Sequence, residues 1–160
     1  MANDLIDFEE LIQVLMDLAN DIEEGYKDTL IKDRHYTTDY ALLDSVKTQV
    51  VAGERAYEVT MTLKEYWKYL ENDTKPHFPP PSALMRWVEI KPIFPRPDKN
   101  GRIPKPQQLA YLIGRKISIF GTKGTHGLQK TKDSIIPMYR ERISAALGRD
   151  MVKYIRKVMQ

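Results

Sequence analysis

The sequence predicts an α+β fold, in which a small antiparallel sheet is built on a β-hairpin over about residues 44–63. We expect an N-terminal helix, two middle helices and a C-terminal helix to pack on this sheet. Strand-like alternation in the hairpin and helix-like apolar spacing on both sides of it indicate this arrangement. A lone two-stranded hairpin is marginally stable in water, so its apolar face needs a cover. The chain of 160 residues suits one compact domain, and we predict a single domain over residues 1–160.

The hairpin is predicted from two short runs. In the second run, Tyr57, Val59 and Met61 alternate with polar residues, so apolar and polar side chains fall on opposite faces of an extended chain. A weaker alternation precedes it over residues 46–51. Between the runs lies a short connection whose Gly53 can adopt the positive φ of a tight turn.

The N-terminal helix is predicted to run from Asn3 or Asp4 to Glu24. Gly25 follows as a natural stop, and the acidic residues near the start suit the positive end of the helix dipole. Apolar residues recur in steps of three and four along it. They are Leu5, Phe8, Ile12, Leu15, Ala19 and Ile22.

Between this helix and the middle helices we expect two short elements. Residues 26–41 have mixed polarity and predict a short helix leading into the hairpin. Residues 64–70 carry Tyr66, Trp67 and Tyr69 and predict a short helix or turn against the strands. Such an aromatic cluster can also stack nucleic-acid bases, but its flanking residues are acidic as often as basic, which favours core packing.

The middle helices are predicted over residues 82–90, after the Ser82 N-cap, and over residues 107–120. The stretch 92–106 between them holds five prolines and an Asn-Gly turn signal, and it predicts a projecting loop. That loop is basic. Its cations are Arg96, Lys99, Arg102 and Lys105.

The last third of the chain predicts a flexible connection, a link and a helix. Gly121 ends the second middle helix, and residues 121–127 form a glycine-rich, partly basic segment. Residues 130–136 predict a short strand or an extended link. Pro137 then opens the C-terminal helix, because its missing N–H falls in the first turn. Gly148 is a possible weak point near the middle of that helix.

Charge is unevenly distributed, although the net charge is only +3. Residues 1–24 hold eight acids and no lysine or arginine, whereas residues 91–160 hold sixteen basic residues and four acids. Two interpretations remain open. The helices present solvated faces of opposite sign, or the charges match neighbouring copies or a nucleic acid.

Composition excludes several classes of protein. The chain has no cysteine, which excludes disulfides and thiolate zinc sites. No apolar run approaches the ~18 residues of a membrane span, and the first residues lack the basic region of a signal peptide. We therefore expect a cytosolic protein or a component of an assembled particle.

The sequence shows no grouping of reactive residues, and we predict neither an enzyme nor a cofactor or metal site. The three histidines, His35, His77 and His126, include no helical metal-binding pair. The glycines of residues 121–127 follow a helix, which is the wrong order for a phosphate-binding loop. Asp98 stands alone among basic residues, which argues against a two-metal nuclease.

The chain resembles the tail-completion (neck) proteins of long-tailed bacteriophages. The resemblance rests on an acidic N-terminal helix and on five later stretches: LLDSV before the hairpin, EYWKYLEN followed by Lys75-Pro76, SALMRWVEIK, LAYLIGRKISIFGTKGT and ISAALGRDMVKYIRKV. It covers most of the chain from Leu42 onward. The proline-rich stretch 92–106 departs from shorter members of the family.

This resemblance implies a structural α+β subunit that forms a homo-oligomeric ring at the head–tail junction of the virion, after assembly in the host cytoplasm. Its expected partners are neighbouring neck, portal-adaptor and tail proteins, with DNA passing through the ring and no membrane involved. The candidate contacts between subunits or rings are Arg96, Lys99, Arg102, Lys105, Lys123, His126, Asp17, Asp21 and Glu24.

Two alternatives stay open. One is a small DNA-binding domain that uses the basic C-terminal helix and the loops; its affinity for duplex DNA would fall steeply with salt. The other is a hydrolase or nuclease whose site is assembled from distant residues, of which His126 and Asp98 are the candidates to test.

Overall fold

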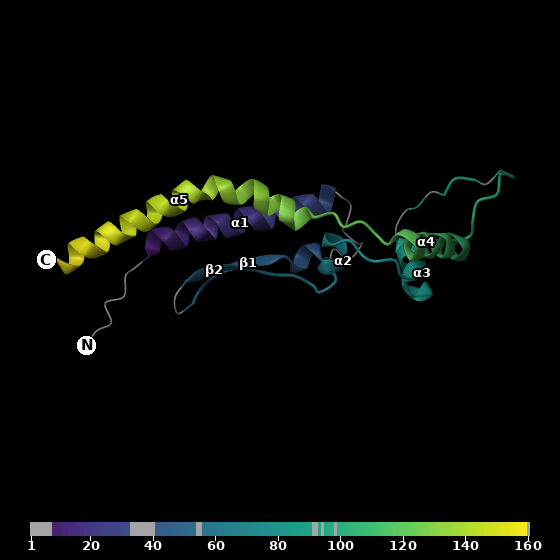
Figure 1. Ribbon diagram of the computed structural model, residues 1–160, viewed down its shortest axis with the longest axis horizontal. Helices are drawn as coiled ribbons and strands as arrows, with labels where there is room; N and C mark the ends of the chain where they lie inside the picture. Colours follow the sequence, from purple (N-terminus) through teal and green to yellow (C-terminus); the bar gives the residue numbers. More distant parts are fainter. Residues whose placement is uncertain are drawn as a thin grey trace.

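The computed structural model describes residues 8–32, 41–53, 56–90, 93, 95–97 and 99–159. It confirms the α+β class: one antiparallel hairpin lies among helices (Figure 1). In chain order the elements are α1 (Glu9–Lys32), a 3₁₀ turn (Leu43–Ser45), β1 (Lys47–Ala52), β2 (Tyr57–Thr62), α2 (Trp67–Glu71), α3 (Pro81–Ile90), α4 (Pro106–Phe120) and α5 (Gly127–Val158).

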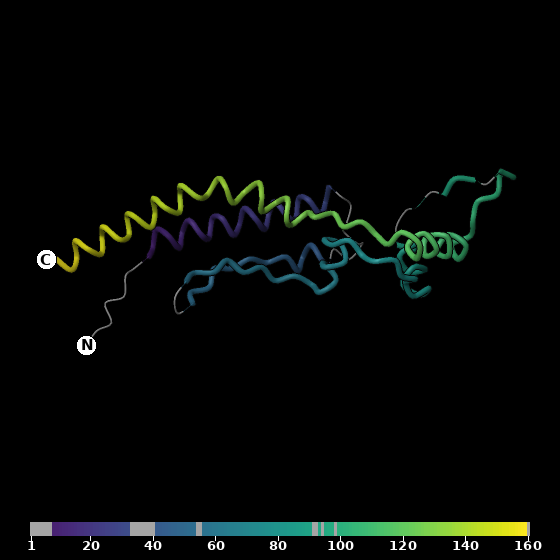
Figure 2. The backbone as a smooth tube through the Cα atoms, viewed as in Figure 1, coloured from purple at the N-terminus to yellow at the C-terminus, as the bar shows by residue number. Residues whose placement is uncertain are grey.

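The molecule is elongated. Figure 2 follows the two long helices, α1 and α5, which run side by side with the hairpin against α1. The short helices α3 and α4 contact each other and lie at the end of the molecule opposite the carboxyl end of α5. None of the helices that the structure describes combines the length and apolar character that a membrane span requires.

The hairpin confirms the predicted alternation. Val50 pairs with Val59 and Thr48 with Met61, in antiparallel register. Val59 and Met61 pack against the core, whereas Glu58 on the other face is exposed. The predicted turn is closed by the Gly53 N–H, which donates to the Ala56 carbonyl oxygen over 2.8 Å.

Helix α1 extends beyond its predicted end. It continues through Gly25 to Lys32, so the prediction that Gly25 stops the helix is wrong. A Cβ at Gly25 would lie only 3.0 Å from Cγ2 of Thr131 and 3.1 Å from Cδ1 of Ile135, both on α5. The glycine therefore allows the two helices to approach closely. The predicted start at Asn3 or Asp4 lies outside the described residues.

Two apolar clusters form the core around α1. One joins Tyr26 and Leu30 of α1 to Leu42 and Val46, with Trp67 of α2 packed against it. The other joins Leu18 and Ile22 to Tyr139 of α5, with strand residues alongside. The aromatic segment 64–70 thus contributes Trp67 to the core as predicted, whereas Tyr69 is 72% exposed.

Helix α5 begins earlier than predicted. Residues 130–136 are helical rather than a strand or link, and Pro137 lies inside the helix instead of opening it. The physical reason is tertiary. Tyr139 is buried and Ile135 packs beside it in the cluster with α1, and this packing outweighs the hydrogen bond that a proline removes from the helix interior. Gly148 does not interrupt the helix.

The two middle helices were expected to pack on the sheet, and the structure places them elsewhere. Within the described residues, α3 and α4 pack mainly on each other, whereas α1 covers the hairpin. Gly114 of α4 meets Leu84 and Phe78 so closely that a Cβ there would lie 2.9 Å from each side chain. Of the predicted short helix over residues 26–41, residues 26–32 belong to α1, and residues 33–40 lie outside the described part.

Candidate interaction surfaces

Two buried carboxylates are used structurally, each at the N-terminus of a helix. The Glu71 carboxylate accepts the backbone N–H groups of Leu128 and Gln129 at 3.0 and 2.9 Å, at the start of α5. The Asp150 carboxylate accepts the N–H of Leu11 at 2.9 Å, at the start of α1. Both anions therefore satisfy donors that a helix leaves unpaired, next to the positive end of its dipole.

The remaining chemistry in the described part of the chain is sparse. No three or more histidine or acidic side chains gather there as a metal site would require, and no buried side-chain oxygen or nitrogen there is left without a hydrogen bond. Burial, and secondarily the Glu71 charge, raises the pKa of Tyr26 to about 12. This tyrosine lies in the core. Asp98 lies outside the described residues.

The glycine-rich segment 121–127 is packed rather than projecting. The Thr74 N–H donates to the Thr122 carbonyl at 2.9 Å, and the Gly124 N–H donates to the Asp73 carboxylate at 2.8 Å. A Cβ at Gly124 would lie 2.2 Å from the Glu71 carbonyl oxygen, so the backbones touch. The prediction of a flexible segment is therefore corrected: its glycines permit close contact with the segment that follows α2.

Two predicted contact residues lie on this segment. Lys123 is exposed. His126 has φ 51° just before α5, and its Nε2 lies 3.7 Å from the Asp73 carboxylate, with both side chains largely exposed. The structure thus places these two side chains at the surface, on a backbone that is fixed.

The acidic candidates on α1 divide into two groups. Asp17 forms an ion pair with Arg142 of α5 at 2.8 Å, and the Tyr139 hydroxyl donates a hydrogen bond to the Asp21 carboxylate. Both therefore hold α1 against α5 within one chain. Glu24, which follows Asp17 and Asp21 on the same row of α1, is exposed.

Further ion pairs join the acidic and basic parts of the sequence. The Glu10 carboxylate pairs with Arg149 and, at 2.6 Å, with Lys153. Hydrogen bonds from Lys153 and Arg149 hold the pKa of Glu10 below its usual value. Part of the charge asymmetry is thus matched between α1 and α5, an arrangement that neither interpretation of the sequence included.

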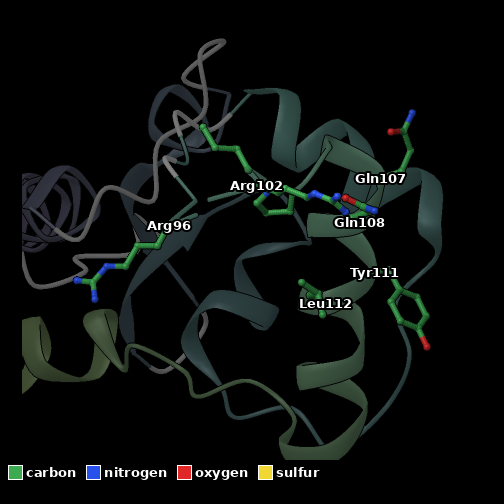
Figure 3. A pocket seen from close by; sticks show the side chains of 8 residues that line it. Arg96, Arg102, Gln107, Gln108, Tyr111 and Leu112 are labelled. Atoms are coloured by element: carbon green, nitrogen blue, oxygen red, sulfur yellow. The ribbon is translucent and has the colours of Figure 1, made fainter. Parts of the chain in front are cut away.

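The basic stretch before α4 surrounds a hollow of about 720 Å³. Figure 3 shows Arg102 reaching toward Gln108, whereas Arg96 points away from α4. Lys99 and Lys105 are exposed on the same stretch. The hollow is lined by Arg96, Arg102, Ile103, Pro104, Gln107, Gln108, Tyr111 and Leu112.

Helices α3 and α4 expose several large apolar side chains. On α4, Leu112 and Phe120 are 53% and 74% exposed. Over residues 109–120, apolar residues are distributed around the whole circumference of the helix. Because α3 covers only one side, this distribution in the sequence indicates that apolar residues on another side stay exposed. The other exposed apolar side chains of the pair are Trp87, Tyr111 and Ile119.

Two smaller hollows flank α3. One, of about 420 Å³, is lined mainly by apolar side chains, including Phe78, Met85 and Tyr111. The other, of about 410 Å³, includes Trp87, Ile113 and Ile117. Both contain Leu84, and both suit apolar side chains from outside the chain.

Comparisons with known protein families, with curated proteins and with solved structures found no match to this chain.

Proposed function

We propose that this chain is a non-enzymatic structural protein of the head–tail junction of a long-tailed bacteriophage, where it forms a ring around the DNA channel between the portal side and the tail. The observation that carries the proposal is the uncovered apolar surface of α3 and α4. Soluble monomers keep such contiguous apolar surface small, and larger patches mark interaction sites.

The small number of buried residues in α3 and α4 supports the inference that this surface is an interaction site. Leu84, Ala110 and Gly114 are the residues that the pair buries, and Gly114 has no side chain to contribute. On α4, Tyr111 and Ile119 are 60% and 54% exposed. An element that buries so little of its own apolar surface gains stability when a partner covers the rest.

Two of the stretches that carry the resemblance lie on this pair of helices. SALMRWVEIK covers most of α3, and LAYLIGRKISIFGTKGT covers most of α4 and the packed connection that follows. The resemblance and the exposed surface therefore point to the same part of the chain as the assembly contact.

The test is to examine the purified chain by native mass spectrometry and negative-stain electron microscopy across a range of concentrations. We expect a closed ring of identical subunits, and antibody labelling at the neck of particles of the phage that encodes it. Leu112→Asp should reduce ring formation, whereas Met138→Asp on α5, which also changes an exposed apolar residue, should leave it intact. A chain that stays monomeric and is missing from the particles would reject the proposal.

A second candidate is a DNA-binding domain, and one observation favours it. Between residues 81 and 123 the described basic side chains outnumber the acids by eight to one, and Arg102 and Tyr111 line the same hollow. Such a surface contacts phosphates without reading sequence. This candidate requires the monomer to bind short duplex DNA with strong salt dependence, and it requires Lys99→Glu with Lys105→Glu to weaken that binding.

A further inference from the structure

Two exposed helix surfaces of opposite charge lie on different parts of the molecule. The first, the α4 face, consists of Leu112, Arg115, Lys116 and Ile119. The second, the α1 stripe, consists of Glu24, Asp28 and Ile31. Neither is covered by another element of the described chain. The α4 face carries cations, and the α1 stripe carries carboxylates.

The α4 face combines apolar and basic side chains. Leu112 and Ile119 are each more than half exposed, and they lie on either side of Arg115 along the helix. Within the described part of the chain, Arg115 and Lys116 form no ion pair. The opposite side of α4 is closed against α3 at Gly114, so the α4 face is the side that remains available.

Helix α1 packs on two neighbours, and the α1 stripe continues the row of Asp17 and Asp21 beyond the part of that row that engages α5. One side packs on α5, where Gly25 meets Thr131. Another packs on the hairpin, where the Glu23 carboxylate accepts the Thr48 N–H at 2.7 Å. Glu24, Asp28 and Ile31 follow one another at spacings of four and three residues, and all three are exposed.

Among the described residues, the charges of the α1 stripe have no ion-pair partner. Glu24 and Asp28 form no ion pair with any described residue. Beside them, Ile31 is 48% exposed. The stripe thus offers two carboxylates followed by an apolar side chain.

The two surfaces match in length and in chemistry. Each spans about two helical turns, or roughly 10 Å. Placing Asp28 near Arg115 or Lys116 brings Ile31 to the aliphatic side chains that flank these cations. An exposed ion pair by itself contributes little, so burial of the aliphatic groups supplies affinity while the charges fix orientation.

A single chain does not bring the two surfaces together. Helix α4 lies with α3 at one end of the molecule, whereas α1 contacts α5 and the hairpin (Figure 1). The acidic partner that the α4 face fits must therefore come from another molecule, and each copy of this chain carries one.

We infer that the α4 face of one copy binds the α1 stripe of a second copy. The two surfaces differ, so the contact is heterologous, and repeating it yields either a closed ring or an open filament. The inference deepens the proposed function by giving the ring its subunit contact, and it rests on that function only for closure of the ring.

Charge exchange tests the contact. The α4 variant carries Arg115→Glu and Lys116→Glu, and the α1 variant carries Glu24→Lys and Asp28→Lys. Alone, each places like charges in the contact and should self-associate at least about tenfold more weakly than the wild type in sedimentation velocity. An equimolar mixture of the two should recover association, because each variant then meets opposite charges, and so should one chain carrying all four changes.

The control carries Arg140→Glu and Lys157→Glu, two exposed cations of α5, and should associate like the wild type. Circular dichroism checks that every variant is folded. The inference is overturned if the wild type does not self-associate, if both single-surface variants associate normally, or if the mixture fails to recover. Loss of duplex DNA binding in the α4 variant, without recovery on mixing, would overturn it by assigning the α4 face to DNA.

Failure of this inference and failure of the proposed function give different results. If rings form at the neck regardless of the charge changes, the inferred contact between the α4 face and the α1 stripe is rejected, but the proposed function is supported. Association that follows the charge exchange, by a chain that never joins phage particles, would support the contact and reject the function.

Discussion

The Asp150 carboxylate accepts the backbone N–H of Leu11 at 2.9 Å, across 139 residues of sequence. It also lies 3.4 Å from the N–H of Glu10 and is completely buried. The beginning of α1 is thus capped by a side chain near the carboxyl end of α5. Since Glu71 caps α5 in the same way, two long-range carboxylates fix where the long helices begin.

Asp150→Asn should lower the free energy of unfolding by about 1–3 kcal/mol, because the amide replaces one acceptor oxygen with a donor that faces buried N–H groups. Urea unfolding measures the change. Asp133→Asn, at an exposed position on the same helix, should change stability by less than about 0.5 kcal/mol. Equal effects at the two positions would contradict a capping role for Asp150.

Gly25→Leu should destabilise the protein by about 1–3 kcal/mol, because its side chain would enter the contact with Thr131 and Ile135 of α5. The matched variant Gly148→Leu has no atom within 4 Å of its Cβ and should stabilise α5 by up to about 1 kcal/mol. Thermal unfolding of both variants measures the difference. A gain in stability at Gly25 would show that the two helices do not approach as closely as described.

The pairing of Glu10 with Lys153 and Arg149 should make stability depend on acid pH. The pKa of Glu10 is lowered in the folded protein, mainly by the hydrogen bond from Lys153, from its usual value of 4.5. Its contribution is therefore complete above that value and is lost as the pH falls through the lowered pKa. As the pH is lowered from 6, the free energy of unfolding should fall less steeply for Glu10→Gln than for the wild type. Glu58→Gln, on the exposed face of the hairpin, should follow the wild type.

Tyr26 should make the protein sensitive to alkali. Burial raises its pKa from 10.0 to about 12, so the unfolded chain ionises first, and stability should decline as the pH rises from 10 toward 12. Tyr26→Phe removes this ionisation and should show a smaller decline than the wild type over the same range. Denaturant unfolding at pH 9 and pH 11 makes the comparison, and identical declines would contradict the placement of the hydroxyl in the core.

The local pattern predicted the hairpin and the middle helices well, because side-chain periodicity and turn residues act over short distances. Val59 and Met61 face the core as their alternation predicts, and α4 begins at Pro106, one residue before its predicted start. The same local rules failed at Gly25 and Pro137. A glycine and a proline are stop signals only where nothing else stabilises the helix, and here contacts between α1 and α5 do.

The candidate contact residues also show which features local sequence predicts and which features depend on tertiary packing. Composition revealed the acidic start and the basic end of the chain, but Asp17 and Asp21 engage α5 within the chain. Their periodic positions carry no information about the partner, because Arg142 and Tyr139 lie more than a hundred residues away. Glu24, by contrast, stayed exposed, as a surface acid would.

The sequence by itself determined the class of fold, the position of the hairpin and the basic character of the stretch before α4, since each depends on neighbouring residues. Only the tertiary structure decided where α1 ends and where α5 begins, which acids are satisfied within the chain, and which face of α4 is uncovered. Those features depend on which distant side chains meet, and packing, rather than local preference, sets that.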